Sequence, residues 1–139
     1  MVSFRTTATV RTDGAVEVVE EIVYDFGTNQ RRGIIRWIPD RFSYDSVEPG
    51  FDRITPIDDV DVLADGGSVP VQRSSENGHT VLKIGDEDVF LTGSHTYQIA
   101  YTMRGALNRF DDHDELSLNI TGNQWTVPIE RASATVVAP

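Results

Sequence analysis

The densest group of polar side chains in this chain of 139 residues is the run Asp111-Asp112-His113-Asp114-Glu115. Loop carboxylates are the ligands that Ca²⁺ takes, and a histidine among carboxylates can bind a transition metal. The run lacks the glycine and the ligand spacing of an EF-hand loop. A shorter acidic run, Asp86-Glu87-Asp88, follows Gly85 and suits a turn. We therefore predict solvated acidic loops and no bound cofactor, with a cation site at Asp111–Glu115 as the alternative.

Arginines are concentrated at one place in an acidic sequence. Arg31, Arg32 and Arg36 lie close together, although the chain has only 12 basic residues against 22 acidic ones and a net charge of −10. One interpretation is salt bridging to neighbouring carboxylates. The other is contact with an anionic ligand or partner through charge-assisted hydrogen bonds. A surface this negative repels phosphate backbones, so we expect no binding to nucleic acid.

Recognisable catalytic arrangements are missing from the sequence. The chain has no cysteine, which excludes a thiol nucleophile, a disulfide and a zinc knuckle. There is no nucleophile elbow, phosphate-binding loop or dinucleotide fingerprint. Paired carboxylates would suit glycosidase chemistry, but 22 acidic residues form pairs by chance. We predict a non-catalytic domain for ligand recognition, partner recognition or assembly. The alternative is a carboxylate-dependent sugar-acting enzyme or a calcium-dependent carbohydrate-binding domain.

Alternation of apolar and polar side chains with a period of two predicts strands along most of the chain. The clearest is Ser94–Met103, in which the odd-numbered residues share one face. Asp13-Gly14 and Asn77-Gly78 are hairpin-turn signals. No long segment keeps a helical period. The other predicted strands are Ser3–Val10, Ala15–Phe26, Ile34–Ile38, Ile54–Leu63, Val69–Arg73, Thr80–Ile84, Glu115–Ile120 and Ala132–Ala138.

About nine strands with such turn spacing are typical of a sandwich. We predict an all-β fold, namely an antiparallel β-sandwich in which residues 1–139 form one domain. An immunoglobulin-like topology is a more specific version, with Trp37 as its core tryptophan. The apolar run Ile34–Ile38 suits a strand buried on both faces. Glu20 interrupts the apolar face of Ala15–Phe26, so we expect this strand to bend or to leave the core there.

Glu115–Arg131 is the stretch that we expect to organise the core. Its apolar alternation stops at the turn residues Gly122-Asn123 and restarts at Trp125. Pro128 has no N–H to donate, which predicts an edge or a bulge. We expect Trp125 to be buried, and Trp125→Ala to cost about 3–5 kcal/mol as in other cores.

Recognition is expected at a loop end of the sandwich, because inward side chains fill such a core and loops on a rigid scaffold are the usual binding elements. The loops Phe42–Phe51 and Leu107–Asp114 combine aromatic and charged residues. They either cap the sandwich or face a partner. The partner-facing residues that we predict are Tyr44, Phe51, Arg109 and Phe110.

Four stretches cover nearly the whole chain in a characteristic order. They are Asp13-Gly14 with Val16-Glu17-Val18 and Glu20; Arg32-Gly33-Ile34-Ile35-Arg36 with Ile38-Pro39; Ile84-Gly85-Asp86 with Thr92-Gly93 and Tyr97-Gln98-Ile99-Ala100-Tyr101; and Asp114-Glu115-Leu116 with Asn119-Ile120-Thr121-Gly122, Trp125 and Val127-Pro128-Ile129. Together they resemble the N-terminal domain of the predicted membrane protein family called domain-of-unknown-function family 2207.

The resemblance implies a longer parent protein, with a signal sequence, this β-domain and flanking transmembrane helices that anchor it. It implies a location at the cell membrane on the extracytoplasmic side. The aromatic and charged loops described above favour a protein partner or self-association. The family has no established activity, so no catalytic residue carries over. The sequence has Ser117-Leu118 where the family usually has an aromatic pair, and Ile35 where a tyrosine is common.

Overall fold

The structure is a computed structural model that describes residues 1–28, 30–43, 52–104, 107–109, 114–116 and 129–138. These residues form thirteen strands, arranged in four sheets, and no helix. Within the described ranges, therefore, no helix exists that could cross a membrane.

The larger sheet has six strands in the order β13-β1-β2-β10-β6-β7. Neighbouring strands are antiparallel, except that β13 runs parallel to β1. The turn between β1 and β2 is the predicted one at Asp13-Gly14, where Gly14 has a φ of 89°. The strands are β13 (Arg131–Val137), β1 (Ser3–Val10), β2 (Val16–Asp25), β10 (Ser94–Met103), β6 (Ile57–Ala64) and β7 (Gly67–Ser68).

The smaller sheet has three antiparallel strands in the order β3-β9-β8. They are β3 (Gly33–Pro39), β9 (His79–Gly85) and β8 (Val71–Glu76). Asn77 and Gly78 both have positive φ in the turn between β8 and β9, so the predicted hairpin is confirmed. Two short ribbons complete the described strands: β4 (Arg41–Ser43) with β5 (Asp52–Ile54), and β11 (Leu107–Arg109) with β12 (Asp114–Leu116).

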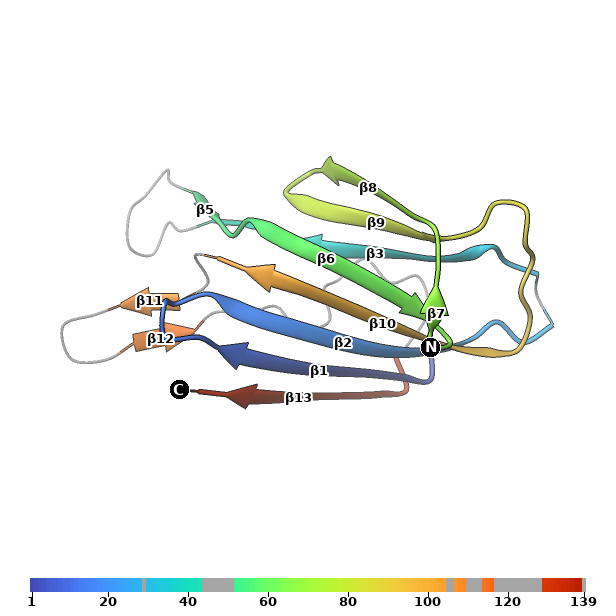
Figure 1. The fold of residues 1–139 in the computed structure, drawn as a ribbon, viewed down its shortest axis with the longest axis horizontal. Helices are drawn as coiled ribbons and strands as arrows, with labels where there is room; N and C mark the ends of the chain where they lie inside the picture. The colour runs from blue at the N-terminus through green and yellow to red at the C-terminus, as the bar shows by residue number, and fades with distance from the viewer. Residues whose placement is uncertain (29, 44–51, 105–106, 110–113, 117–128, 139) are drawn as a thin grey trace.

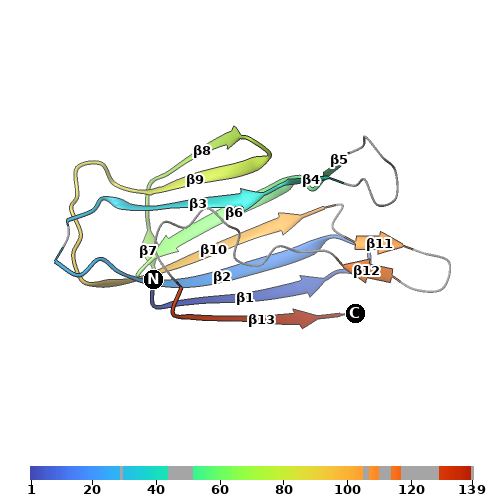
Figure 2. The same ribbon diagram turned by 180° about the vertical axis from the view of Figure 1, so that it is seen from behind.

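The two larger sheets form the layers of a sandwich. Figure 1 and its reverse view in Figure 2 show the three-stranded sheet on one side of the six-stranded sheet. The buried apolar side chains between them include Phe4, Val18, Ile22, Ile34, Ile38, Ile57, Leu82, Ile84, Tyr97, Ile99 and Tyr101. The all-β sandwich is thus confirmed, although the immunoglobulin-like topology is not. Eight strands are long, and the additional ones have only two or three residues.

Strand β3 corrects two predictions. It is not buried on both faces, because Ile34, Arg36 and Ile38 point into the core while Ile35 is 48% exposed. Trp37 lies on the same outward face of β3 as Ile35 and is only half-buried, so it is not the core tryptophan. Its indole ring meets the ring of His79 edge-on, with centroids 5.7 Å apart. The alternation of the strand makes position 36 an inward one between Ile34 and Ile38, and Arg36 occupies it.

The prediction for Glu20 is also wrong. Strand β2 keeps an unbroken register with both neighbours, and Glu20 lies opposite Thr6 on β1 and Ile99 on β10. Its side chain is fully buried. The strand therefore neither bends away nor leaves the core, and the carboxylate must be neutralised inside it.

Candidate functional site

Two connections between the sheets lie side by side at one end of the sandwich, the right-hand end in Figure 1. Residues 26–32 lead from β2 to β3, and residues 86–93 lead from β9 to β10. Arg31 and Leu91 exchange two backbone hydrogen bonds of 3.1 and 2.6 Å, and the N–H of Phe26 donates to the carbonyl of Gly93 at 2.9 Å. These bonds hold the two loops together as one structural unit.

Gly33 and Gly85 face each other where these loops enter the smaller sheet. Their φ angles are 156° and 143°. A Cβ on Gly33 would collide with the carbonyl oxygen of Ile84, and one on Gly85 would collide with that of Arg32. The sequence has glycine at both positions because only glycine allows the two backbones to approach this closely.

A pocket of about 320 Å³ opens at this end of the sandwich. We call it the Arg32 pocket. Its lining combines side chains of two kinds, apolar groups that are exposed to solvent and cationic groups. The exposed apolar residues are Ile35 and Phe90, and the cationic ones are Arg31, Arg32 and Lys83. One acidic residue, Glu87, also lines the pocket.

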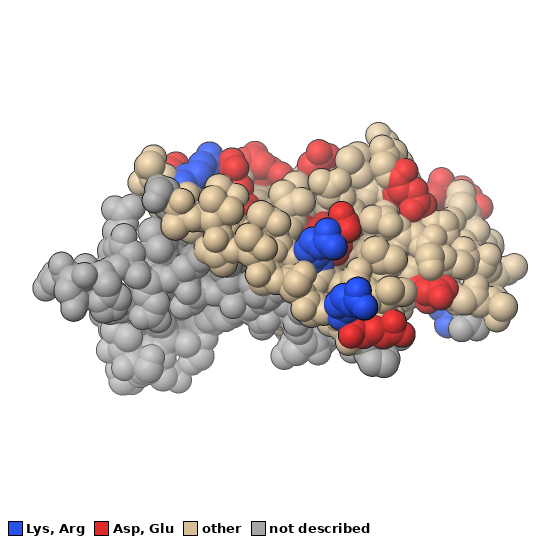
Figure 3. Space-filling view, turned by 90° about the horizontal axis from the view of Figure 1, so that it is seen from below, with Lys and Arg blue, Asp and Glu red and all other residues tan. Residues whose placement is uncertain are grey.

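The charge at the Arg32 pocket is opposite to that of the chain. Three cationic side chains and one carboxylate line it, a local balance of +2, whereas the whole chain carries −10. The guanidinium of Arg32 lies over the ring of Phe90, 5.1 Å from its centroid. The ammonium of Lys83 is 3.5 Å from the carboxylate of Glu87, and both side chains are exposed. On the face in Figure 3, described cations are interspersed with acidic side chains.

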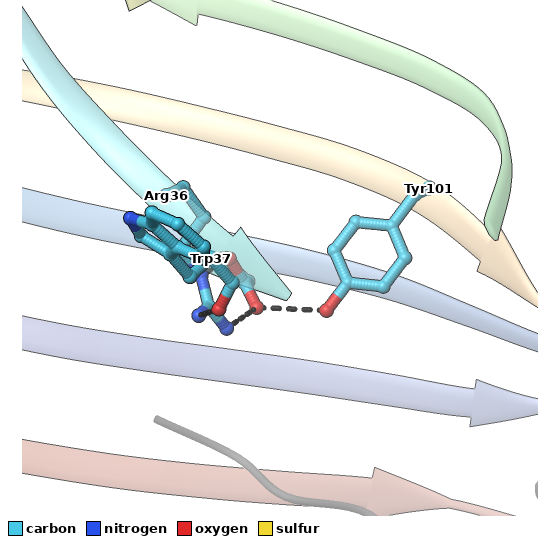
Figure 4. Close-up of polar contacts among 4 residues, drawn as sticks. Arg36, Trp37 and Tyr101 are labelled. Atoms are coloured by element: carbon cyan, nitrogen blue, oxygen red, sulfur yellow. Dashed lines mark hydrogen bonds and ion pairs between the residues drawn. The ribbon is translucent and has the colours of Figure 1, made fainter. Parts of the chain in front are cut away.

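Beneath the surface, the core contains an ion pair that crosses from one sheet to the other. Arg36 on β3 donates from Nε to Oε1 of Glu20 on β2 at 2.8 Å, and from Nη2 to Oε2 at 2.7 Å. The hydroxyl of Tyr101 on β10 donates to the same Oε2 at 2.8 Å (Figure 4). Arg36 also donates to the carbonyl of Trp37 and lies over the ring of Phe4.

The protonation states of this network follow from its surroundings. Burial opposes the charge on Arg36, but the negative charge and hydrogen bonds of Glu20 outweigh it and hold the pKa of Arg36 above its ordinary value. Burial, followed by the charge of Glu20, raises the pKa of Tyr101 well above its ordinary value. Arg36 is therefore charged while the phenol of Tyr101 stays neutral. With Arg36 1% exposed and Glu20 0%, the network serves the fold and has no access to a substrate.

The structure separates the three arginines that were predicted to contact an anion. Arg31 and Arg32 are exposed and line the Arg32 pocket. Arg36 is buried, and the anion that it meets is the protein's own Glu20. Anion contact therefore stays a prediction for Arg31 and Arg32.

Most of the other predicted site residues lie outside the described residues. This holds for Tyr44, Phe51 and Phe110, and for Trp125. Arg109 lies on β11, where the structure describes the backbone alone.

The two acidic runs differ in how much of them is described. Of the run Asp111–Glu115, only Asp114 and Glu115 are described, on β12. Asp86-Glu87-Asp88 forms the predicted turn, in which the N–H of Asp88 donates to Oδ1 of Asp86 at 2.9 Å. The described ranges contain no cluster of three or more histidine or carboxylate side chains that could bind a metal.

Sequence reasoning missed three residues of the Arg32 pocket. The sequence pattern places Ile35 in a strand buried on both faces, and it gives no site motif at Lys83 or Phe90. The available signal was Val89-Phe90, an apolar pair that directly follows an acidic run. Both side chains are exposed in the structure, Phe90 to 56%. Phe90 and Ile35 both line the Arg32 pocket and are exposed there.

Comparison with known proteins gives a family match over the full length. The family model described as "Predicted membrane protein (DUF2207) N-terminal domain" matches residues 1–139. The chain is 30% identical over 129 residues to the uncharacterized protein YciQ of Escherichia coli (strain K12), an alignment that covers 91% of this chain. The chain spans about a fifth of that protein's length, since the alignment covers 20% of it. No solved structure matches the chain.

Proposed function

The chain belongs to the DUF2207 family of predicted membrane proteins as its N-terminal domain, and from this premise we propose that it is a non-catalytic recognition domain on the extracytoplasmic side of the membrane. The observation that carries the proposal is the Arg32 pocket, a cationic and apolar pocket at a loop end of an otherwise acidic sandwich. Rigid scaffolds commonly place their binding residues in this way.

The geometry of the pocket supports recognition. Its two loops are tied to each other by backbone hydrogen bonds, so the lining is preorganised and little conformational entropy is lost on binding. Ile35 and Phe90 expose apolar surface that a ligand or partner would remove from water. The pocket thus offers both an apolar and an electrostatic contribution to binding.

The buried network supports a non-catalytic role. Arg36 and Tyr101, whose pKa values are raised by their surroundings, are both bonded to Glu20 inside the core. Shifted groups in an enzyme face a cleft where substrate can reach them. Here they link two sheets, and their environment explains stability and not reactivity.

The side of the membrane can be tested because this chain has no cysteine. Ser75 is exposed on β8, so Ser75→Cys in the full-length membrane protein provides a labelling site. A membrane-impermeant maleimide should label this variant in intact cells, and the protein without the substitution is the control. Labelling that requires permeabilised cells would place the domain in the cytoplasm and contradict the proposal.

Recognition can be tested by photo-crosslinking in the full-length protein. A benzophenone amino acid at Ile35 should capture a distinct adduct, which the double substitution Arg31→Gln/Arg32→Gln should abolish. The matched control is the same amino acid at Val136, which is an exposed apolar residue on β13, far from the pocket in sequence. The same adducts from both positions, or an adduct that is insensitive to the double substitution, would refute recognition at this pocket.

A further inference from the structure

We propose that the Arg32 pocket binds a small amphipathic anion, in which an apolar chain or ring carries a carboxylate or phosphate group. This inference rests on the proposed function and specifies the chemistry that the pocket recognises. It follows from the two halves of the lining, which offer a different contact to each end of such a molecule.

The cationic half provides the contact for the anionic group. Arg31 and Arg32 are adjacent and exposed, and Arg32 is held over the ring of Phe90. A guanidinium binds carboxylates and phosphates through two parallel hydrogen bonds. Among the described residues, Lys83 forms an exposed pair with Glu87 at 3.5 Å, and such a pair is weak enough for a ligand anion to replace it.

The apolar half provides the contact for the chain or ring. Ile35 and Phe90 are 48% and 56% exposed, and Ile34 and Ile84 form buried apolar surface behind them. Gly33 and Gly85 also line the pocket and add no side chain to it. An apolar group here would remove exposed hydrophobic surface from water.

The size of the pocket limits the ligand. About 320 Å³ is at the lower end of the roughly 300–1,000 Å³ of small-molecule sites. A single medium-length chain or one ring system fits this volume. A purely ionic ligand would leave the apolar half empty, and a neutral one would leave the arginines without an anion.

The test uses decanoate as the probe, below its micelle concentration, with the 139-residue chain. Calorimetry should show saturable binding, and the amide signals of Gly33 and Gly85 should shift in NMR spectra. Acetate has the same head group without the chain, and decyltrimethylammonium has the same chain with the opposite charge. Both should bind at least about tenfold more weakly, because each loses one half of the contacts.

Variants locate the binding to the pocket. Arg31→Gln/Arg32→Gln and Ile35→Asn should each weaken decanoate binding by about tenfold or more. The matched controls are Arg5→Gln/Arg131→Gln, which removes two exposed charges from the larger sheet, and Val136→Asn. Both controls should retain decanoate affinity within about twofold.

The following outcomes would overturn the inference. They are no saturable decanoate binding, equal binding of decyltrimethylammonium, and unchanged affinity in both pocket variants. Binding to phosphatidylglycerol vesicles without binding to free decanoate would also overturn it, since the cations would then contact a membrane surface. If decanoate shows no binding while the crosslink from Ile35 persists and still depends on Arg31 and Arg32, the proposed recognition function is retained and only the proposed ligand class is wrong.

Discussion

Arg36 and Glu20 join the two sheets through the core by a bidentate ion pair, with Nε–Oε1 at 2.8 Å and Nη2–Oε2 at 2.7 Å. Each charge is removed from water, so each depends on the other for compensation. The forked guanidinium also requires one relative placement of β3 and β2. The pair therefore makes this sheet packing specific in a way that apolar side chains alone do not.

Breaking the pair should destabilise the fold strongly. Glu20→Gln leaves the charge of Arg36 buried without its counterion, and it should lower the free energy of unfolding by about 3–5 kcal/mol. Urea denaturation measures this loss. The matched control is Asp58→Asn, since Asp58 forms an exposed pair with Arg104 at 3.5 Å and should cost at most about 1 kcal/mol. Equal effects of the two substitutions would show that the core pair is not needed.

The two buried tyrosines of β10 should respond differently to loss of the hydroxyl. Tyr101→Phe removes a hydrogen bond to the carboxylate of Glu20 and should cost about 1.5–3 kcal/mol. In the described part of the chain the hydroxyl of Tyr97 has no hydrogen-bond partner, and burial raises its pKa to about 12. Tyr97→Phe should therefore be neutral or stabilising in the same urea measurement. A larger loss for Tyr97→Phe would contradict this assignment.

The facing glycines should tolerate no side chain. Gly33→Ala and Gly85→Ala each place a Cβ against a carbonyl oxygen at a strained φ, so each should cost about 2 kcal/mol or more. Gly66→Ala is the control, because Gly66 also has positive φ but open space around its Cα. It should cost only about 1 kcal/mol. Thermal unfolding compares the three variants, and similar losses in all three would mean that close approach does not matter.

Stability should depend on pH through His95 and Asp65. The ring nitrogens of His95 face two acceptors, Oδ2 of Asp65 at 2.7 Å and the carbonyl of Thr92 at 2.9 Å, so the doubly protonated ring fits. The hydrogen bond with Asp65 raises the pKa of His95, although burial opposes this. Hydrogen bonds from Thr96 and His95 lower the pKa of Asp65.

The sign of this dependence follows from the direction of each shift. A raised folded-state pKa means that the contribution of His95 is complete below its unfolded value of about 6.5 and is lost as the pH rises through the folded value. A lowered pKa means that the contribution of Asp65 is lost only as the pH falls below the usual carboxyl range. The wild type should therefore have a higher urea midpoint than His95→Gln, and this difference should be larger at about pH 5.5 than at about pH 9. Asp65→Asn should abolish this difference, and a difference that persists in Asp65→Asn would exclude the pair as its source.

The sequence alone determined the strands and their turns. Ser94–Met103 alternates over its whole length and is β10, and Tyr97, Ile99 and Tyr101 are buried on the face that its odd-numbered residues share. Asn77-Gly78 forms the predicted hairpin because positive φ is a property of the turn residues themselves. The period of a strand and the φ of a turn depend on neighbours in sequence, so a single sequence contains enough information for both.

Only the tertiary structure decided what Glu20, Arg36 and the Arg32 pocket are. In the sequence, Glu20 interrupts an apolar face, and Arg36 is compatible with either a salt bridge or an anion contact. Both residues can be buried because each pairs with the other from the opposite sheet, although they are 16 positions apart in sequence. Arg32 and Phe90 likewise meet only because two distant loops are bonded side by side. Alternation along one strand determines which residues share a face. Which face is covered, and by which partner, is decided by the packing of one sheet on the other.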